Sequence, residues 1–523
     1  MTNSPAQSAH TGRIRDRLDA NLTHPFHDAD GDKLREECGV FGAINAADAS
    51  AATALGLHAL QHRGQEAVGI TSFDGTDFYS RRGLGHVADN FSSSEAIGEL
   101  PGHMAAGHVR YSTTGGSGLR NVQPLYAELA SGGFAVAHNG NISNSQALRA
   151  DLVSKGSIFQ STSDTEVIIH LVATSRYPTT ADRLIDALRL VEGAYALIVM
   201  TPEGMIACRD PLGIRPLVMG RMGDAIVFAS ESVAFDVVGA TLIREVEPGE
   251  MLQVGFDGEV KSVRPFGSPA ARPCIFEHVY FSRPDSYFAG RSVYEARKAI
   301  GTQLALEAPC DVDLVVPVPD SGVPAAIGYA QESGVPFELG IIRSHYVGRT
   351  FIQPSDSARH SGVKRKHNAN RGLVAGKRIV LIDDSIVRGT TSSTIEKLDE
   401  SAYGELLTRV YHGGEAGARE VHFRVASPPT VHSCFYGVDT PERSKLLAAR
   451  LELEPMREFI KADSLAFISI DGLYRAVGQK DRDNACPQFC DACFTGDYPT
   501  SLTDFRMSEQ RAAQLPFADP KAA

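Results

Sequence analysis

The rhythm of apolar runs changes near residue 265, and this change constrains the fold more than any other feature of the sequence. From 38 to 254, short β-like runs such as 134–137 and 195–200 alternate with turn-forming clusters and a few helical stretches. That pattern is typical of an α+β domain with antiparallel sheets. Farther along, apolar strands at 314–316 and 378–382 each lead into a polar loop and then a helix. This repetition predicts a second domain with a parallel α/β sheet.

Domain boundaries follow from this change and from the polar start of the chain. A single hydrophobic core rarely serves more than about 250–300 residues, so a chain of 523 residues requires at least two cores. We expect an N-terminal leader, a first domain, a second domain and a C-terminal tail, over 1–37, 38–265, 266–500 and 501–523.

Composition excludes several classes of protein. Hydrophobic residues make up 43% of the chain and charged residues 22%, as in globular proteins. The net charge of −12 argues against nucleic acid as a partner, although a local basic loop can still bind a small phosphorylated ligand. No window approaches the ~18 consecutive apolar residues of a membrane helix, and the start lacks an apolar secretory segment. We therefore expect a cytoplasmic protein without membrane contact.

The longest candidate motif is RIVLIDDSIVRGTT at 378–391. Ligands of parallel sheets bind outside the carboxyl ends of the strands, where Asp383 and Asp384 suit ribose hydroxyls and a Mg²⁺ shell. The next residues open a helix whose N–H groups would receive a phosphate. Two acidic residues after a strand are also ordinary turn and capping chemistry. The complete segment resembles the phosphoribosyl pyrophosphate (PRPP) signature of type I phosphoribosyltransferases. The PRPP ligands implied are Asp383, Asp384, Arg388, Gly389, Thr390 and Thr391.

Two further segments resemble parts of the same site. VPVPDSG at 316–322 resembles the pyrophosphate loop, which implies PRPP contacts from Asp320 and Ser321 and a share of the Mg²⁺ site for Ser321. The basic stretch 343–370 resembles the mobile flap, whose closure would exclude water and neutralise the departing pyrophosphate. A proline-stiffened connection and a solvated charged face are the structural alternatives. The candidate ligands in the flap are Arg349, Thr350 and Lys366.

Cys38 begins the first apolar run after the polar leader. Taken alone, it is typical of a small buried residue in a core strand. A cysteine freed at the N-terminus carries its own base, because an α-amino group with a pKa of about 8 can accept the thiol proton. The surrounding motifs are CGVFG, HRGQE, HVRYST, HNGN and SDTE, at 38–42, 62–66, 108–113, 138–141 and 163–166. They resemble, in order, those of N-terminal-nucleophile glutaminase domains, which implies an αββα fold, removal of a propeptide over 1–37 and catalysis by Cys38.

Glutamine presents an α-carboxylate, an α-ammonium and a side-chain amide, and each needs its own partner. Arg110 suits the carboxylate and Asp164 the ammonium. Attack on the amide creates an oxyanion, for which the Asn139 side-chain NH₂ and the Gly140 backbone N–H are suitable donors. An isolated Asn-Gly pair is more typical of a turn. The resemblance also places Arg63 among the glutamine ligands, and the alternative for Arg63 is a surface ion pair.

Eight cysteines in such a chain indicate a nucleophile, metal ligands or buried thiols before a disulfide framework. Four thiolates suit a [4Fe-4S] cluster or a structural zinc ion, and residue types alone leave both open. Cys486 completes the C-x-x-x-C-x-x-C of radical enzymes that cleave S-adenosylmethionine, but such a motif belongs in an early barrel loop. We interpret Cys208 and Cys310 as buried thiols. The cysteines that resemble cluster ligands of the iron–sulfur branch of the amidophosphoribosyltransferase family are Cys274, Cys434, Cys490 and Cys493.

Residues from about 38 to 500 resemble that family as a whole. The resemblance implies that ammonia from glutamine passes internally to C1 of PRPP, giving 5-phosphoribosylamine, glutamate and pyrophosphate in the first committed step of purine synthesis. It further implies homotetramers, feedback inhibition by purine nucleotides and one Mg²⁺ per subunit. Residues 398–413 are extra relative to the family pattern, and a surface insertion is their simplest interpretation.

Two other functions compete with this interpretation. A non-enzymatic regulator could keep the second domain as a PRPP sensor, but the complete set of nucleophile motifs argues against it. A glutaminase could also serve another acceptor, such as a sugar phosphate or aspartate, but the PRPP signature argues against that.

Overall fold

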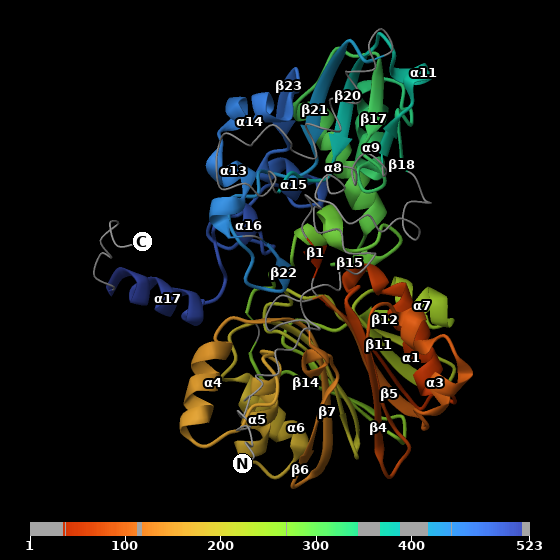
Figure 1. Cartoon of the computed structure of the whole chain (residues 1–523), viewed down its shortest axis with the longest axis vertical. Coiled ribbons are helices and arrows are strands. Elements are labelled where there is room, and N and C mark those ends of the chain that lie inside the picture. Colours follow the sequence, from red (N-terminus) through yellow and green to blue (C-terminus); the bar gives the residue numbers. More distant parts are fainter. Residues whose placement is uncertain are drawn as a thin grey trace, which may run out of the picture.

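The computed structural model describes residues 35–36, 38–111, 118–267, 269–343, 367–387, 417–440 and 442–514. The N-terminal half forms a lower body and the C-terminal half an upper body in the view of Figure 1. Within the described ranges, no helix is both long and apolar enough to cross a membrane.

The lower body is built on two antiparallel sheets packed face to face. Apolar side chains such as Val40 and Ala106 from one sheet and Ala137 and Ile198 from the other fill the space between them. The first sheet has the order β12 (Thr241–Glu245), β10 (Val218–Met222), β11 (Ala225–Ala229), β2 (Cys38–Ile44), β5 (Met104–Arg110), β3 (Ala67–Phe73) and β4 (Phe78–Leu84). The second has the order β14 (Val260–Val263), β13 (Met251–Gly255), β9 (Gly204–Arg209), β8 (Gly193–Thr201), β7 (Gly132–Ile142) and β6 (Leu125–Leu129).

Helices cover both outer faces of this sandwich. The first sheet packs against α1 (Ala49–Ala59), α2 (Val87–Phe91), α3 (Ser94–Gly98) and α7 (Val233–Val238). The second packs against α4 (Ser145–Ser154), α5 (Glu166–Thr174) and α6 (Thr180–Leu188). Central strands therefore have two buried faces, and every residue of β2 and β8 is buried. The αββα fold predicted for the first domain is confirmed, with the expected runs 134–137 and 195–200 inside β7 and β8.

The upper body contains a four-stranded parallel sheet. Its order is β17 (Leu314–Pro317), β20 (Arg378–Asp383), β21 (Glu420–Val425) and β23 (Ser464–Phe467). Val315 and Val380 pack toward α8 (Val293–Glu307) and α9 (Val323–Ser333), whereas Val316 and Leu381 pack toward α13 (Leu447–Arg450) and α14 (Leu453–Ile460). This arrangement confirms the predicted parallel α/β sheet.

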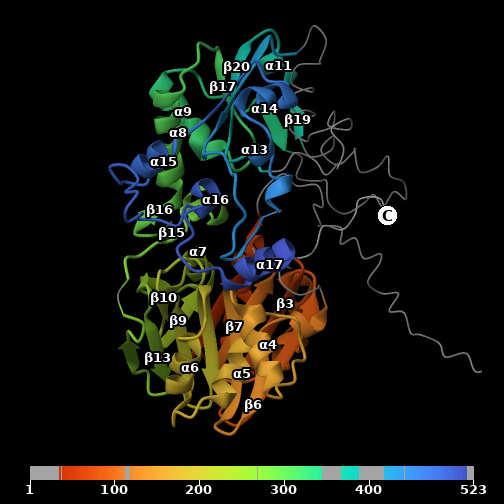
Figure 2. The same ribbon diagram turned by 90° about the vertical axis from the view of Figure 1, so that its left-hand side faces the viewer.

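Chain segments pass between the two bodies at several points. The short strand β1 (Arg35–Glu36) pairs antiparallel with β22 (Val438–Asp439) of the upper body. The helix α17 (Thr503–Gln514), which opens the segment interpreted as a tail, lies beside α4 (Figures 1 and 2). The Asp504 carboxylate accepts hydrogen bonds from the backbone N–H groups of Gln146 and Ala147, at 2.7 and 3.0 Å. Asp504 therefore caps the N-terminus of α4 from the far end of the chain.

Candidate active sites

Cys38 is the first residue of β2, which lies in the first sheet between β11 and β5. The register pairs Cys38 with Arg110, the last residue of β5. Cys38 is 8% exposed and follows β1 after one residue. Because β1 pairs with the upper body, Cys38 lies at the end of the sheet that faces that body.

Asn139 and Gly140 lie on β7, in the facing sheet. The Asn139 Nδ2 donates to the Ser230 hydroxyl at 3.2 Å, and this hydroxyl also accepts from the Val40 N–H at 3.0 Å. Ser230 thereby joins the predicted oxyanion donor to the strand that carries Cys38. Gly140 has φ +143°, and a Cβ there would lie 2.1 Å from the Ala194 carbonyl oxygen. Only glycine fits this position without moving β8.

The two residues predicted to hold the glutamine backbone are buried beside these groups. Arg110 is 5% exposed and Asp164 8%. One Asp164 oxygen accepts from the Ile142 N–H at 3.0 Å and the other from the Thr165 N–H at 2.9 Å. Since Ile142 follows Gly140 by two residues, this carboxylate is attached to the predicted oxyanion segment.

Two histidines lie close to this site. His138 forms a hydrogen bond through Nδ1 with the Thr165 hydroxyl at 3.1 Å, and His108 one through Nε2 with the His138 carbonyl at 3.1 Å. Burial lowers the pKa of both imidazoles, and lowers that of His108 to about 3. Both side chains are therefore neutral near pH 7 and hold the strands together through hydrogen bonds.

Arg63, predicted to bind glutamine, lies in a buried ion cluster. Its Nε donates to Glu231, and its Nη2 donates to Glu277 at 2.8 Å and to the Ser282 hydroxyl at 3.3 Å. Both carboxylates are buried, and Glu277 and Ser282 belong to the upper body. Arg63 thus forms ion pairs, but these are buried rather than on the surface as the alternative to ligand binding assumed.

The carboxylates of the PRPP signature lie at the carboxyl end of β20. Asp383 and Asp384 are both buried, and the Ser385 hydroxyl donates to Asp384 at 2.7 Å. The predicted pyrophosphate loop is adjacent, because Val318 N–H donates to the Ile382 carbonyl at 2.8 Å. The structure therefore brings the 316–322 loop and the acidic pair to one edge of the sheet.

Asp320 lies on the outer side of this loop. It is exposed and forms an ion pair with Arg343 at 2.7 Å. The remaining predicted PRPP ligands lie outside the described residues, as does the insertion at 398–413. These ligands are Arg349, Thr350, Lys366, Arg388, Gly389, Thr390 and Thr391.

Four cysteines from three distant segments line one small pocket, together with apolar side chains such as Phe276 and Phe281. Backbone hydrogen bonds join the segments: Ile275 N–H donates to the carbonyl of Cys490 at 3.1 Å, and His432 N–H to that of Cys493 at 3.0 Å. The four are Cys274, Cys434, Cys490 and Cys493. Cys486 is exposed and outside the pocket; Cys208 is buried as predicted, but Cys310 is only partly buried.

Burial raises the pKa of the Cys274 thiol to about 12 and also raises the pKa values of Cys490 and Cys493 well above the ordinary value. Such thiols stay protonated unless a cation stabilises the thiolates. Four cysteines lining one pocket are a donor set that fits a group held by several thiolates. Across the described ranges, no three His, Cys, Asp or Glu side chains are arranged around a single metal-ion position.

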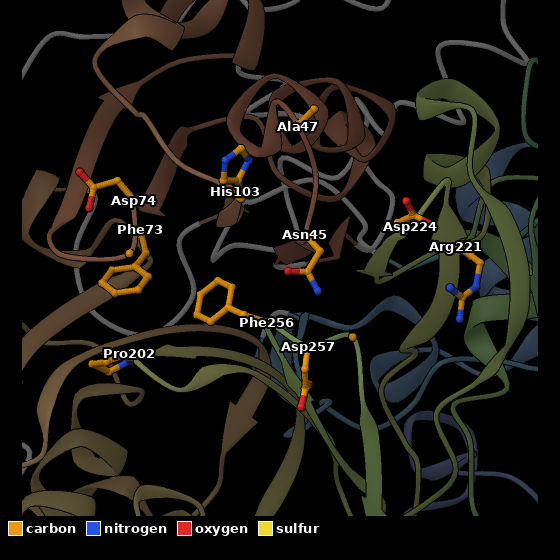
Figure 3. A pocket seen from close by; sticks show the side chains of 12 residues that line it. Asn45, Ala47, Phe73, Asp74, His103, Pro202, Arg221, Asp224, Phe256 and Asp257 are labelled. Atoms are coloured by element: carbon orange, nitrogen blue, oxygen red, sulfur yellow. The ribbon is translucent and has the colours of Figure 1, made fainter.

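Another pocket, of about 900 Å³, lies at the opposite end of β2 from Cys38, and Figure 3 shows its lining. Asn45 in its lining directly follows β2, whereas Cys38 begins that strand. Seven strand residues span roughly 20 Å, at about 3.3 Å per residue. The rings of Phe73 and Phe256 lie 6.1 Å apart in the lining, and no predicted site residue within the described part of the chain reaches this pocket.

Several residues at these sites were not predicted. Ser230 and Glu231 follow β11 as single polar residues in a turn, and Arg215 lies in a loop. Nothing in their local sequence distinguishes them from surface residues. Only Glu277 had a signal, since it opens the EHVYFSRPDS run before the first helix of the upper body.

Comparisons with known proteins agree with this geometry. A family model described as a glutamine amidotransferase domain matches residues 108–237. The amidophosphoribosyltransferase of Rhizobium etli is 55% identical over 492 residues, covering 92% of this chain and 96% of that protein. The Bacillus subtilis amidophosphoribosyltransferase is 48% identical over 470 residues, covering 90% and 95%.

Two solved structures share the fold over most of their length. The B. subtilis glutamine PRPP amidotransferase complexed with ADP and GMP has a TM-score of 0.81 and 46% identity, covering 89% of this chain and 98% of that one. A structure described as the allosteric regulatory enzyme of purine biosynthesis has a TM-score of 0.82 and 47% identity, covering 89% and 97%.

Proposed function

The chain belongs to the amidophosphoribosyltransferase family, and we propose that its two bodies divide one reaction between them. It is a glutamine PRPP amidotransferase and catalyses the first step of purine biosynthesis. Glutamine, PRPP and water give 5-phosphoribosylamine, glutamate and pyrophosphate. In our proposal residues 38–265 release ammonia from glutamine, and residues 266–500 join that ammonia to C1 of PRPP.

We assign the nucleophile to Cys38 after removal of residues 1–37. The freed α-amine takes the thiol proton, and Sγ attacks the glutamine amide carbon. Collapse of the tetrahedral intermediate releases ammonia and leaves a thioester, which water cleaves to glutamate. Burial lowers the pKa of His108 and His138 and so makes them weaker bases than an ordinary imidazole, which supports the α-amine as the base.

Four other residues complete the proposed glutamine site. Asn139 Nδ2 and the Gly140 N–H stabilise the oxyanion, which the special conformation of Gly140 supports. Arg110 holds the glutamine carboxylate and Asp164 the ammonium, and their burial next to β7 supports both assignments. For Arg63 a direct ligand role stays a prediction, because its guanidinium contacts support a structural task.

PRPP occupies the carboxyl ends of β17 and β20 in our proposal. Asp383 and Asp384 hold the ribose hydroxyls, and the loop around Asp320 and Ser321 holds the pyrophosphate. Ser321, Asp383 and Asp384 would hold the Mg²⁺ ion, which when bound neutralises charge on the leaving pyrophosphate. The contact between the Val318 N–H and the Ile382 carbonyl supports a single site made of both loops.

The pocket lined by four cysteines supports a further proposal, a [4Fe-4S] cluster with a structural role. The four cysteines come from three segments of the upper body that lie far apart in the sequence, and a bound group would join these segments. Zinc is the alternative that metal analysis would distinguish. Following the family, we also propose homotetramers and feedback inhibition by purine nucleotides, and the ADP and GMP bound to the B. subtilis protein support the latter.

One observation carries the division of labour: the Cys38 strand and Asn139 meet in the lower body, whereas the acidic pair Asp383 and Asp384 ends a strand of the upper sheet. A Cys38→Ala enzyme should lose synthesis from glutamine but keep synthesis from free ammonia. Cys486→Ser, which changes an exposed thiol, is the matched control and should keep both. Loss of both reactions in a folded Cys38→Ala protein would contradict the proposal.

A further inference from the structure

Ser230 fixes the orientation of the Asn139 side-chain amide. The Ser230 side chain is buried, and its oxygen accepts from Asn139 Nδ2 at 3.2 Å and from the Val40 N–H at 3.0 Å. An Asn amide carries two N–H bonds, so one points to Ser230 and the other remains for a ligand. Because Val40 lies two residues after Cys38 on the same strand, the hydroxyl also relates the amide to the nucleophile.

The neighbouring residue, Glu231, joins this turn to the upper body. Its Oε1 accepts from Arg63 and from His62 at 2.5 Å, both in the lower body. Its Oε2 accepts from the Arg283 N–H at 2.8 Å and from the Ser286 hydroxyl at 2.7 Å, both in the upper body. The two oxygens of one buried carboxylate are thus divided between the two bodies.

The cluster continues through Glu277, which is fully buried. Glu277 accepts from Arg63 at 2.8 Å, from Arg215 at 3.0 Å and from the Ser282 hydroxyl at 2.6 Å. Two guanidinium groups therefore balance two carboxylates. Burial opposes ionisation of Glu231, but the charges of Arg63 and His62 prevail and hold its pKa well below the ordinary value.

Arg297 of α8 continues the contacts toward the PRPP signature. Its guanidinium donates to the carbonyls of His278 and Ser282, at 2.9 and 2.7 Å, and so holds the turn that carries Glu277. Burial lowers the pKa of Arg297, and the negative charge of Asp384 acts on it in the opposite direction. Arg297 thus interacts with Asp384, which is predicted to bind PRPP, and with the turn that belongs to the cluster around Glu231.

We infer that the Ser230–Glu231 turn is a positioning element for the oxyanion amide of Asn139, and that its contacts with Arg283 and Ser286 make this position depend on the seating of the upper body. Ser230 and Glu231 do not touch substrate; they act through Asn139. The inference rests on the proposed oxyanion role of Asn139. A shift of the upper body after PRPP binds would move Glu231 and hence the amide, since packed, hydrogen-bonded groups move together.

A double-mutant cycle tests whether Ser230 positions the Asn139 amide. Ser230→Ala should lower kcat for glutamine hydrolysis about tenfold, with KM for glutamine within about twofold. This loss is smaller than the roughly 10²–10³ for complete removal of an oxyanion donor, because the amide is misplaced but still present. In an Asn139→Ala background the same change should lower kcat by no more than about twofold, because the amide through which Ser230 mainly acts is gone and only its bond with the Val40 N–H is left to lose. Synthesis from free ammonia reports folding and should stay near the parent rate. An equal loss in both backgrounds would overturn the inference.

A single substitution tests whether the position of the Asn139 amide depends on the upper body. We expect PRPP to stimulate glutamine hydrolysis by the parent enzyme, because the position of the Asn139 amide depends on the upper body. Ser286→Ala removes one hydrogen bond from the upper body to Glu231 and should reduce this stimulation at least about threefold, with the rate without PRPP within about twofold. Ser262→Ala removes a similar Ser–Glu bond, to Glu250 inside the lower body, and should leave the stimulation unchanged. Equal stimulation in Ser286→Ala and the parent would overturn the dependence on the upper body.

The outcomes separate this inference from the proposed function. If Asn139→Ala hydrolyses glutamine at the parent rate, the proposed oxyanion role fails and the inference fails with it. If Asn139→Ala is impaired but Ser230→Ala is not, the proposed function stands and only the inference is overturned.

Discussion

Gly140 and Gly437 meet at the boundary between the two bodies in direct backbone contact. A Cβ on Gly437 would lie 2.9 Å from the Cα of Gly140. Beside them, Asn141 Nδ2 donates to the Phe435 carbonyl at 2.9 Å. The segment 434–437, which begins with a candidate cluster ligand, therefore packs directly on the predicted oxyanion segment of β7.

A Gly437→Ala substitution should impair the glutamine reaction selectively. Its φ of +101° disfavours alanine, and the new methyl would push on the Gly140 backbone. We expect synthesis from glutamine to fall about tenfold or more, as for a displaced oxyanion donor, while synthesis from ammonia changes less than about twofold. Gly334→Ala is the control, since it shares a positive φ of +71° but has open space around it. Similar behaviour of the two variants would refute a role for this contact.

Replacing Cys434 should release the group bound by the four cysteines. Cys434→Ser removes one thiolate from the pocket, and we expect lower iron content, loss of brown colour and a lower melting temperature. Cys486→Ser should keep the parent's iron content, brown colour and melting temperature, because Cys486 is exposed and outside the pocket. Metal analysis and thermal unfolding of both proteins check this. Stoichiometric zinc in the parent protein would exclude the cluster.

Removing one carboxylate of the PRPP signature should affect both nitrogen donors. Asp384→Asn weakens the contacts to ribose and Mg²⁺, so the rate of 5-phosphoribosylamine formation should fall at least about tenfold with glutamine and with ammonia alike. Glutamine hydrolysis measured without PRPP should remain near the parent rate. Chelation of divalent cations in the parent enzyme should have the same pattern. A defect limited to glutamine would speak against the assigned site.

The buried cluster around Glu231 should contribute stability that depends on pH. The folded-state pKa of Glu231 lies below its ordinary value of 4.5, so its contribution is present above about pH 4.5 and is lost as the pH falls through the folded-state pKa. At pH 7, Glu231→Gln should destabilise the fold by roughly 3–5 kcal/mol, because Arg63 loses a buried partner.

Urea midpoints at pH 7 and pH 4 measure this contribution. The gap between the parent and Glu231→Gln should narrow at the lower pH. Glu454→Gln, which breaks an exposed pair with Arg457, should leave the urea midpoint nearly unchanged at either pH. A gap that widens toward pH 4 would reverse the sign and rule out the stated cause.

Much of the fold was predictable because its signals are local. The apolar runs 134–137 and 378–382 predict strands, because strands that are buried on both faces carry apolar side chains on both. Cys38, Asp383 and Asp384 were identifiable for a similar reason, since each stands at a strand end within a short motif. The comparisons confirm the predicted fold class and function, while the individual site residues stay predictions until they are tested.

The contacts between the bodies could not be read from the sequence. Ser230 and Glu231 form hydrogen bonds with partners more than fifty positions away in the sequence, such as Asn139 and Ser286. Asp504 caps a helix that begins some 360 positions earlier, at Ser145. For Arg63 the motif favoured a substrate contact, and its two buried carboxylate partners could not be identified from the sequence. Long-range pairings of this kind depend on how whole domains pack, which no local pattern encodes.

The most direct test of the account is the mass of the N-terminus in protein that makes 5-phosphoribosylamine from glutamine. We predict that active protein begins at Cys38, and that each 5-phosphoribosylamine formed from glutamine is accompanied by one glutamate and one pyrophosphate. Fully active protein that still carries Met1 would contradict the assignment of Cys38 as the N-terminal nucleophile.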